Sequence, residues 1–171
     1  VVSGYRERKI LKRFRVTPVS PVMLLGVEFT IYVLYAAASM LLIFPTAFLF
    51  WGVKLPGSWA AFLGSWFLTL VSTLSIGMMV GGIAKNEKIA SVIACILYFP
   101  MLIFSGATLP FEVMPKVMQG MVSLFPLTQG IQLMKATSLG ISVDNFWLPV
   151  AVMGIVTVLC TGISIKFFKW E

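Results

Sequence analysis

Four long stretches without a charged side chain constrain this chain more than any other feature of its sequence. They contain 25, 30, 23 and 21 residues, at residues 29–53, 55–84, 89–111 and 145–165. Each exceeds the roughly 20 residues that an α-helix needs to cross the hydrocarbon core of a membrane. Because a backbone surrounded by lipid must satisfy its own hydrogen bonds, these stretches predict transmembrane helices. We place the spans at about residues 24–52, 59–84, 89–108 and 146–166.

A fifth uncharged stretch, residues 117–134, has a different composition. It is 18 residues long but contains polar residues, glycines and a proline at eight positions: Gln119, Gly120, Ser123, Pro126, Thr128, Gln129, Gly130 and Gln132. This composition predicts short amphipathic or re-entrant helices over residues 109–140 at the outer surface. The expected fold is therefore an all-α membrane protein. It has one transmembrane domain over residues 1–171, with four transmembrane helices, an N-terminal amphipathic cytoplasmic helix and an outer re-entrant helical hairpin.

The overall composition excludes a water-soluble enzyme. The chain is 59% hydrophobic and only 11% charged, whereas soluble domains are about 25% charged. It contains no histidine, which removes histidine-based catalysis and most zinc sites. The two cysteines lie inside apolar stretches, Cys95 and Cys160, and we interpret them as buried structural thiols.

The net charge of +7 is explained by membrane topology. With four spans, ten of the thirteen Lys and Arg residues fall on one side, six of them between Arg6 and Arg15. This asymmetry follows the positive-inside rule and predicts a cytoplasmic C-terminus. Counting residues 117–134 as a fifth span would give nine against four, so the composition of that stretch decides between the two topologies. A nucleic-acid partner is not expected.

Residues 5–17 predict a basic amphipathic helix that precedes the first span. Ile10, Leu11 and Phe14 share one helical stripe, and basic residues surround it. Pro18 and Pro21 then end the helix. Two interpretations stay open from this pattern: an interfacial helix held on anionic lipid, and a docking element for a cytoplasmic partner.

Two further features lie in or near the first and second spans. Glu28 is a carboxylate close to the cytoplasmic end of the first span, where pairing with an N-terminal Arg or Lys is expected, with proton coupling as the alternative. Small residues follow one face of the second span, and Gly77 and Gly81 form a GxxxG step that favours close helix packing; a pore lining is the alternative. The small residues are Ser72, Ser75, Gly77, Gly81 and Gly82.

Helix-breaking residues are concentrated between Tyr98 and Thr128. Pro100 removes a helix hydrogen bond and predicts a kink, and Pro115 suits the start of a new helix. Several breaks at membrane depth are tolerated only where protein or a cavity shields the backbone. The segment therefore predicts an irregular outer hairpin. Its breaks lie at Pro100, Ser105–Gly106, Pro110, Pro115 and Phe125–Pro126.

The sequence has no strand–GxxxxGK[ST] element, so it contains no phosphate-binding loop. No cofactor is expected on this chain. If ATP drives transport, ATP and Mg²⁺ bind to another chain or to a further domain.

Two of these segments together resemble the permease subunits of type-2 ABC exporters. An early motif of that family lies just before a span and is matched by Glu7, Arg8, Leu11, Arg13, Phe14, Thr17, Pro18 and Ser20. A late motif appears here as SGATLPFEVMP and FPLT, and is matched by Ser105, Gly106, Pro110, Glu112, Pro115, Pro126, Leu127 and Thr128.

The resemblance implies both an architecture and a set of partners. Members usually have six spans, so the two missing spans are expected before Val1, where the chain also lacks an initiator Met. The resemblance implies a second permease copy and two cytoplasmic ATPase subunits. Residues 5–17 then look like the coupling helix that docks to an ATPase, and residues 105–128 look like re-entrant helices at the exit.

Our interpretation is the permease subunit of an ATP-driven exporter in a bacterial plasma membrane. It would move a hydrophobic or amphipathic substrate of the drug, peptide, lipid or glycan class, and multidrug resistance belongs to that range. The alternatives are a passive channel or membrane scaffold without an ATPase, and a proton-coupled transporter. The last needs paired ionisable residues at mid-membrane, and the sequence offers only Glu28 near one edge.

Overall fold

The computed structural model describes residues 2–7, 20–52, 56–109, 111–141 and 147–167. Every regular element in these ranges is helical. In chain order the elements are α1 (Val2–Glu7), α3 (Pro21–Trp51), α4 (Trp59–Ile83), α5 (Glu87–Ile103), the 3₁₀ turn η1 (Phe111–Val113), α6 (Lys116–Val122), α7 (Pro126–Leu139) and α8 (Trp147–Lys166). The predicted all-α class is confirmed for the described part of the chain.

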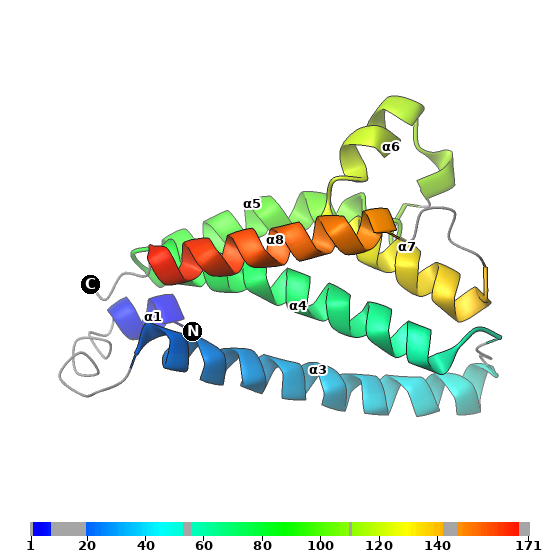
Figure 1. Ribbon diagram of the computed structural model, residues 1–171, viewed down its shortest axis with the longest axis horizontal. Coiled ribbons are helices and arrows are strands. Elements are labelled where there is room, and N and C mark those ends of the chain that lie inside the picture. Colours follow the sequence, from blue (N-terminus) through cyan, green and yellow to red (C-terminus); the bar gives the residue numbers. More distant parts are fainter. Residues whose placement is uncertain (1, 8–19, 53–55, 110, 142–146, 168–171) are drawn as a thin grey trace.

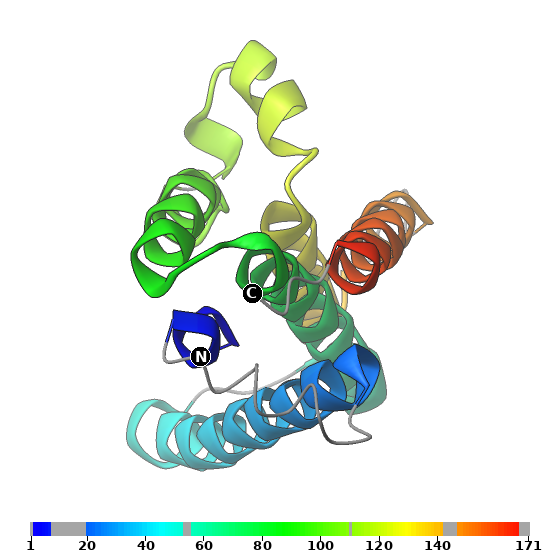
Figure 2. The same cartoon turned by 90° about the vertical axis from the view of Figure 1, so that its left-hand side faces the viewer.

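The long helices run side by side and give the bundle two distinct ends (Figure 1). One end carries α1, the turn between α4 and α5, and the last turn of α8. We call it the basic end, because the exposed Lys85, Lys88 and Lys166 lie there. The other end, which we call the opposite end, carries the last turn of α3, the first turn of α4 and the last turn of α7. Seen from the basic end, α1 lies between α3 and α5 (Figure 2).

Side-chain caps set where the long helices begin. Ser20 caps α3, since its Oγ accepts a hydrogen bond from the Met23 amide at 3.2 Å, and Pro21 occupies the first helical position, where a missing N–H costs nothing. Ser58 caps α4 in the same way. Gly52 ends α3 with φ of 61°, a left-handed conformation that favours glycine. Predicted span bounds of 24–52 and 59–84 thus agree closely with α3 and α4.

Helix α4 is the centre of the bundle and packs against α8, α7, α3, α5 and α1. A row of small hydroxyl residues on α4 is buried against α7 and α8, namely Ser65, Thr69, Ser72 and Ser75. Ser65 and Thr137 of α7 share a hydrogen bond of 3.0 Å between their hydroxyls. Ser164 of α8 donates a hydrogen bond of 3.1 Å to the Met78 carbonyl of α4. Small residues here let the helix axes approach closely.

The structure supports only part of the predicted four-span arrangement. Three helices, α3, α4 and α8, are long and apolar enough to cross a membrane. Helix α5 has 17 residues, about 26 Å at 1.5 Å per residue, which is short of the roughly 30 Å of hydrocarbon. It begins two residues before the predicted span and ends at Ile103 rather than at residue 108. Pro100 lies within α5 and does not end it.

Candidate functional site at the two ends of the bundle

At the basic end, α1 is attached to the start of α5. The backbone N–H of Glu87 donates a hydrogen bond of 3.2 Å to the Glu7 Oε2 atom. Glu87 is the first residue of α5, so this N–H has no partner within its own helix. A carboxylate beside a helix N-terminus is also favoured by the helix dipole. Glu7 therefore connects α1 to α5 by a charge-assisted hydrogen bond.

Most of the predicted ATPase-coupling residues lie outside the described part of the chain. Helix α1 includes Glu7 and starts earlier than the predicted helix, at Val2. Arg8, Leu11, Arg13, Phe14, Thr17 and Pro18 fall within residues 8–19, which are not described. Their coupling role stays a prediction. What the structure adds is that Glu7, next to them, contacts α5.

The predicted outer hairpin begins with a tight backbone reversal after α5. Ser105 is fully buried, and its Oγ donates to the Leu102 carbonyl at 2.8 Å and accepts from the Ala107 amide at 3.2 Å. Gly106 adopts φ of 88°, a conformation that side chains disfavour. These contacts explain why α5 ends where it does. Pro110 lies outside the described residues, and Glu112 lies in η1.

Gln119 of α6 holds η1 and α6 together. Its Nε2 donates to the Phe111 carbonyl at 3.1 Å and to the Met114 carbonyl at 2.9 Å. Pro115 stands at the N-cap of α6. Both hydrogen bonds are accepted by backbone carbonyls of the segment that precedes α6, so a single amide side chain fixes the shape of the hairpin tip.

Replacing Gln119 by leucine is expected to loosen this hairpin. Two hydrogen bonds are lost, each contributing about 1 kcal/mol, while the size of the side chain is nearly kept. Limited proteolysis between residues 111 and 123 should accelerate several-fold. Gln132→Leu is the control, because Gln132 makes no comparable hydrogen bond among the described residues. Equal proteolysis rates for both variants would contradict the assignment.

Helix α7 is short and buries one face in the bundle. It starts at Pro126, has 14 residues and packs against α4 and α8. Thr128, Gln129 and Gly130 are buried, and Gln129 Nε2 donates to the Ser123 carbonyl at 2.6 Å. A Cβ atom added at Gly130 would overlap the Thr69 side chain. Four of the eight residues that distinguish residues 117–134 from a free-standing span are thus buried in protein, and all four lie in the first turns of α7.

The closest helix contacts use glycines other than those of the predicted GxxxG step. A Cβ at Gly82 would lie 3.0 Å from the Ser164 Oγ atom, and Gly130 is tighter still. At Gly77 an added Cβ would meet nothing within 4 Å, and at Gly81 only Val2 of α1. The packing role of Gly77 and Gly81 stays a prediction. Of the cysteines, Cys160 is buried as expected, whereas Cys95 is exposed on α5.

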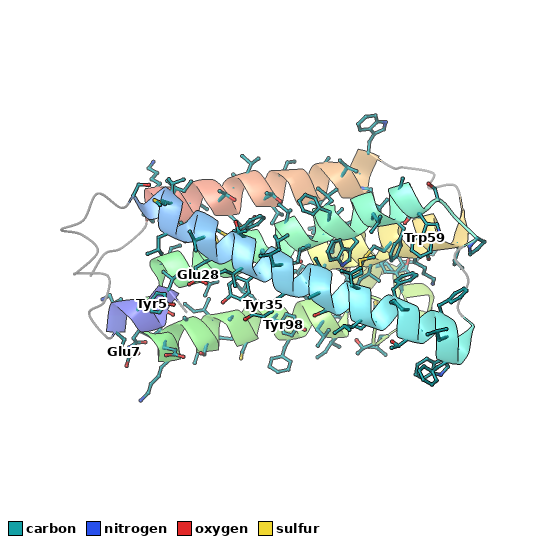
Figure 3. The ribbon with its side chains drawn as sticks, turned by 90° about the horizontal axis from the view of Figure 1, so that it is seen from below. Tyr5, Glu7, Glu28, Tyr35, Trp59 and Tyr98 are labelled. Carbon is teal, nitrogen blue, oxygen red and sulfur yellow. The ribbon has the colours of Figure 1, made fainter. Side chains whose placement is uncertain are left out.

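Sequence reasoning missed how deeply the basic end buries Glu28. Its side chain is 9% exposed, beneath α1, where Val2 and Leu25 form a small apolar cluster. Figure 3 shows Glu28 near Tyr5 of α1. The only signal in the sequence was an acidic residue within an apolar stretch.

Comparison with known proteins gives a consistent assignment. Residues 2–166 match the family described as ABC-2 family transporter protein. An inner membrane transport permease of Escherichia coli K12, YhhJ, is 31% identical over 85 residues, covering 50% of this chain and 23% of the relative. Nodulation protein J of Rhizobium leguminosarum bv. viciae is 29% identical over 92 residues, covering 54% of this chain and 36% of the relative.

The chain thus corresponds to between about a quarter and a third of the length of these relatives. No solved structure matches it. The family match covers every helix described above, from α1 to α8. The family match agrees with the three described helices that are long and apolar enough to cross a membrane. The chain belongs to the ABC-2 family of transporter proteins.

Proposed function

We propose that this chain is part of the permease subunit of an ATP-driven exporter in a bacterial plasma membrane. The family implies an ABC ATPase partner in general, and the sequence itself contains no phosphate-binding loop. ATP and Mg²⁺ therefore bind to the partner, and this chain performs no covalent chemistry. The expected cargo is hydrophobic or amphipathic, of the drug, peptide, lipid or glycan class.

One observation carries the mechanism: α1 contacts the basic end of the bundle at several helices. Val2 packs against Leu25 of α3, and Glu7 binds the first amide of α5. A displacement of α1 by an ATPase would therefore act on α3 and α5 together. In this mechanism the basic end is cytoplasmic, as the positive-inside rule favours, and the C-terminus is cytoplasmic with it.

The opposite end supplies the proposed exit. The hairpin of η1, α6 and α7 lies in that half of the bundle (Figure 1), and α7 packs on α4 and α8. A second permease copy would complete the path, because α5 is exposed along residues 91–100 and leaves an apolar face for further protein. Membrane lipid contacts the remaining outer faces.

Purification of the full protein from its own membranes tests the proposal. We expect an ABC ATPase to co-purify in about equal amounts. Inside-out vesicles containing the complex should accumulate cargo only with hydrolysable ATP. A variant of the ATPase without its phosphate-binding lysine is the control. Transport that persists in that variant, or a protein that purifies without an ATPase, would support the passive channel or scaffold instead.

A further inference from the structure

Glu28 is a buried residue whose carboxylate pairs with no described side chain. It lies in the second turn of α3 with 9% of its surface exposed. No described hydrogen bond or ion pair involves its oxygens. Lys85 and Lys88 lie at the same end of the bundle, but both are exposed and neither pairs with it. An ionised carboxylate at such a position is costly unless a cation or hydrogen-bond donors compensate its charge.

Glu28 lines a cavity of about 200 Å³ between α1, α3 and α4. Val2 of α1 and Met78 of α4 contribute apolar walls, and Tyr32 contributes an aromatic ring one turn after Glu28. Gly77 and Gly81 of α4 also line it. At Gly77 an added Cβ would meet no other atom within 4 Å. The absence of side chains at these two positions therefore leaves the space opposite the carboxylate open.

Aromatic side chains lie beside the carboxylate. Tyr32 lines the cavity with Glu28, and Tyr5 packs against the neighbouring cluster of Val2 and Leu25. Figure 3 shows Tyr5 and Glu28 projecting from α1 and α3 into the same region. A carboxylate together with tyrosine rings and apolar walls attracts cations with apolar substituents, because the ring faces are negative and the walls exclude water.

We propose that this cavity binds an amphipathic organic cation, with an amine or quaternary ammonium group at Glu28. A metal ion fits the cavity poorly, because Ca²⁺ and Mg²⁺ need six or more oxygen ligands. No group of three carboxylate or cysteine side chains that could hold a metal occurs in the described ranges. The site does not depend on the export proposal, since binding requires neither ATP nor an ATPase.

Calorimetric titration of the full protein in lipid nanodiscs tests the site. The probes are dodecyltrimethylammonium, a permanent cation, and dodecyldimethylamine oxide, which has the same tail and no net charge at pH 8. Both are used below their micellar concentrations. We expect the cation to bind about tenfold more tightly or better, as a desolvated cation–carboxylate and cation–π contact allows. In Glu28→Gln the two probes should bind equally.

Further variants test whether the preference for the cation arises in this cavity. Glu87→Gln removes an exposed carboxylate at the same end of the bundle and should keep the preference. Gly77→Leu fills the cavity and should weaken both probes about tenfold. Glu28→Asp, which keeps the charge, covers the case in which Glu28→Gln does not fold, and it should retain a reduced preference.

Equal binding in the unmodified protein would show that an internal Lys or Arg already fills the site, and it would overturn the proposal. A preference that survives Glu28→Gln would also overturn it.

Discussion

Replacing Gly130 by leucine should strongly destabilise the opposite half of the bundle. A Cβ atom at this position already overlaps the Thr69 side chain, and Thr69 is itself buried between α4 and its neighbours. The two helices must separate to accommodate the larger residue, which costs about 3 kcal/mol in a packed interior. In detergent, the midpoint of thermal unfolding should fall markedly, and the yield of folded protein should fall several-fold.

Gly64 provides the matched control for this change. It lies in α4, one turn from the same interface, but an added Cβ would meet nothing within 4 Å. Gly64→Ala should be neutral or slightly stabilising, because alanine favours a helix by up to about 1 kcal/mol over glycine. If Gly130→Leu and Gly64→Ala had the same unfolding midpoint, α7 could not pack against α4 as described.

Substitutions in the predicted coupling segment should abolish transport while leaving the protein in the membrane. Glu7→Ala removes the carboxylate that binds the first amide of α5, a charge-assisted contact of about 1.5–3 kcal/mol. Arg13→Ala and Phe14→Ala remove predicted contacts to the ATPase. We expect ATP-dependent cargo accumulation in vesicles to fall at least tenfold in each, whereas ATP hydrolysis continues.

A charge change outside both the coupling segment and the proposed exit is the control for these variants. Lys166→Gln alters an exposed residue in the last turn of α8 and should leave transport unchanged. The amount of membrane-inserted protein is measured in parallel by blotting. Unchanged transport in all three coupling variants would contradict the assignment of residues 5–17, whatever the result for Glu28.

The sequence predicted the long helices well where local signals coincide with the ends of apolar stretches. At α4, the Ser58 cap directly precedes Trp59, and Lys85 follows two residues after the helix ends. Both bounds agree with prediction to within one residue. At α3, Pro21 was interpreted as a helix terminator, but it is the first residue of the span. Proline is compatible with both positions, and only the Ser20 cap distinguishes them.

The distribution of charges placed the end of α5 too late, at residue 108, whereas the predicted break at Ser105–Gly106 agrees with the observed end at Ile103. Residues 104–109 are uncharged, so they extended the predicted span. In the structure, the hydroxyl groups of Ser105 and Thr108 donate hydrogen bonds to the backbone carbonyls of Leu102 and Ile103. The chain therefore forms a turn here, and the helix does not continue. Such short-range competition by hydroxyl groups is a property of geometry that a hydropathy pattern does not contain.

The remaining differences between the predictions and the structure arise from tertiary contacts. Gly77 and Gly81 have the spacing of a packing motif, yet Gly82 and Gly130 make the tight approaches. Which glycine faces a neighbour depends on how α4 is rotated against α7 and α8. Glu28 lies beneath α1, and its expected pairing with an N-terminal cation stays a prediction, because those cationic side chains lie outside the described part of the chain. Its burial requires the position of α1, which no local pattern predicts.

The hydroxyl row on α4 has a consequence for how the protein is made. Three of its four members, Ser65, Thr69 and Ser75, donate to the carbonyl four residues earlier in the same helix, whereas the buried Ser72 hydroxyl has no partner among the described residues. Such internal hydrogen bonds lower the cost of exposing these groups to lipid. Helix α4 can therefore leave the translocon and wait in the bilayer while the ribosome completes α7 and α8, about 80 residues later along the chain. The hydroxyl groups on its polar face bond within α4 during synthesis, and they contact other helices only after α7 and α8 have been inserted.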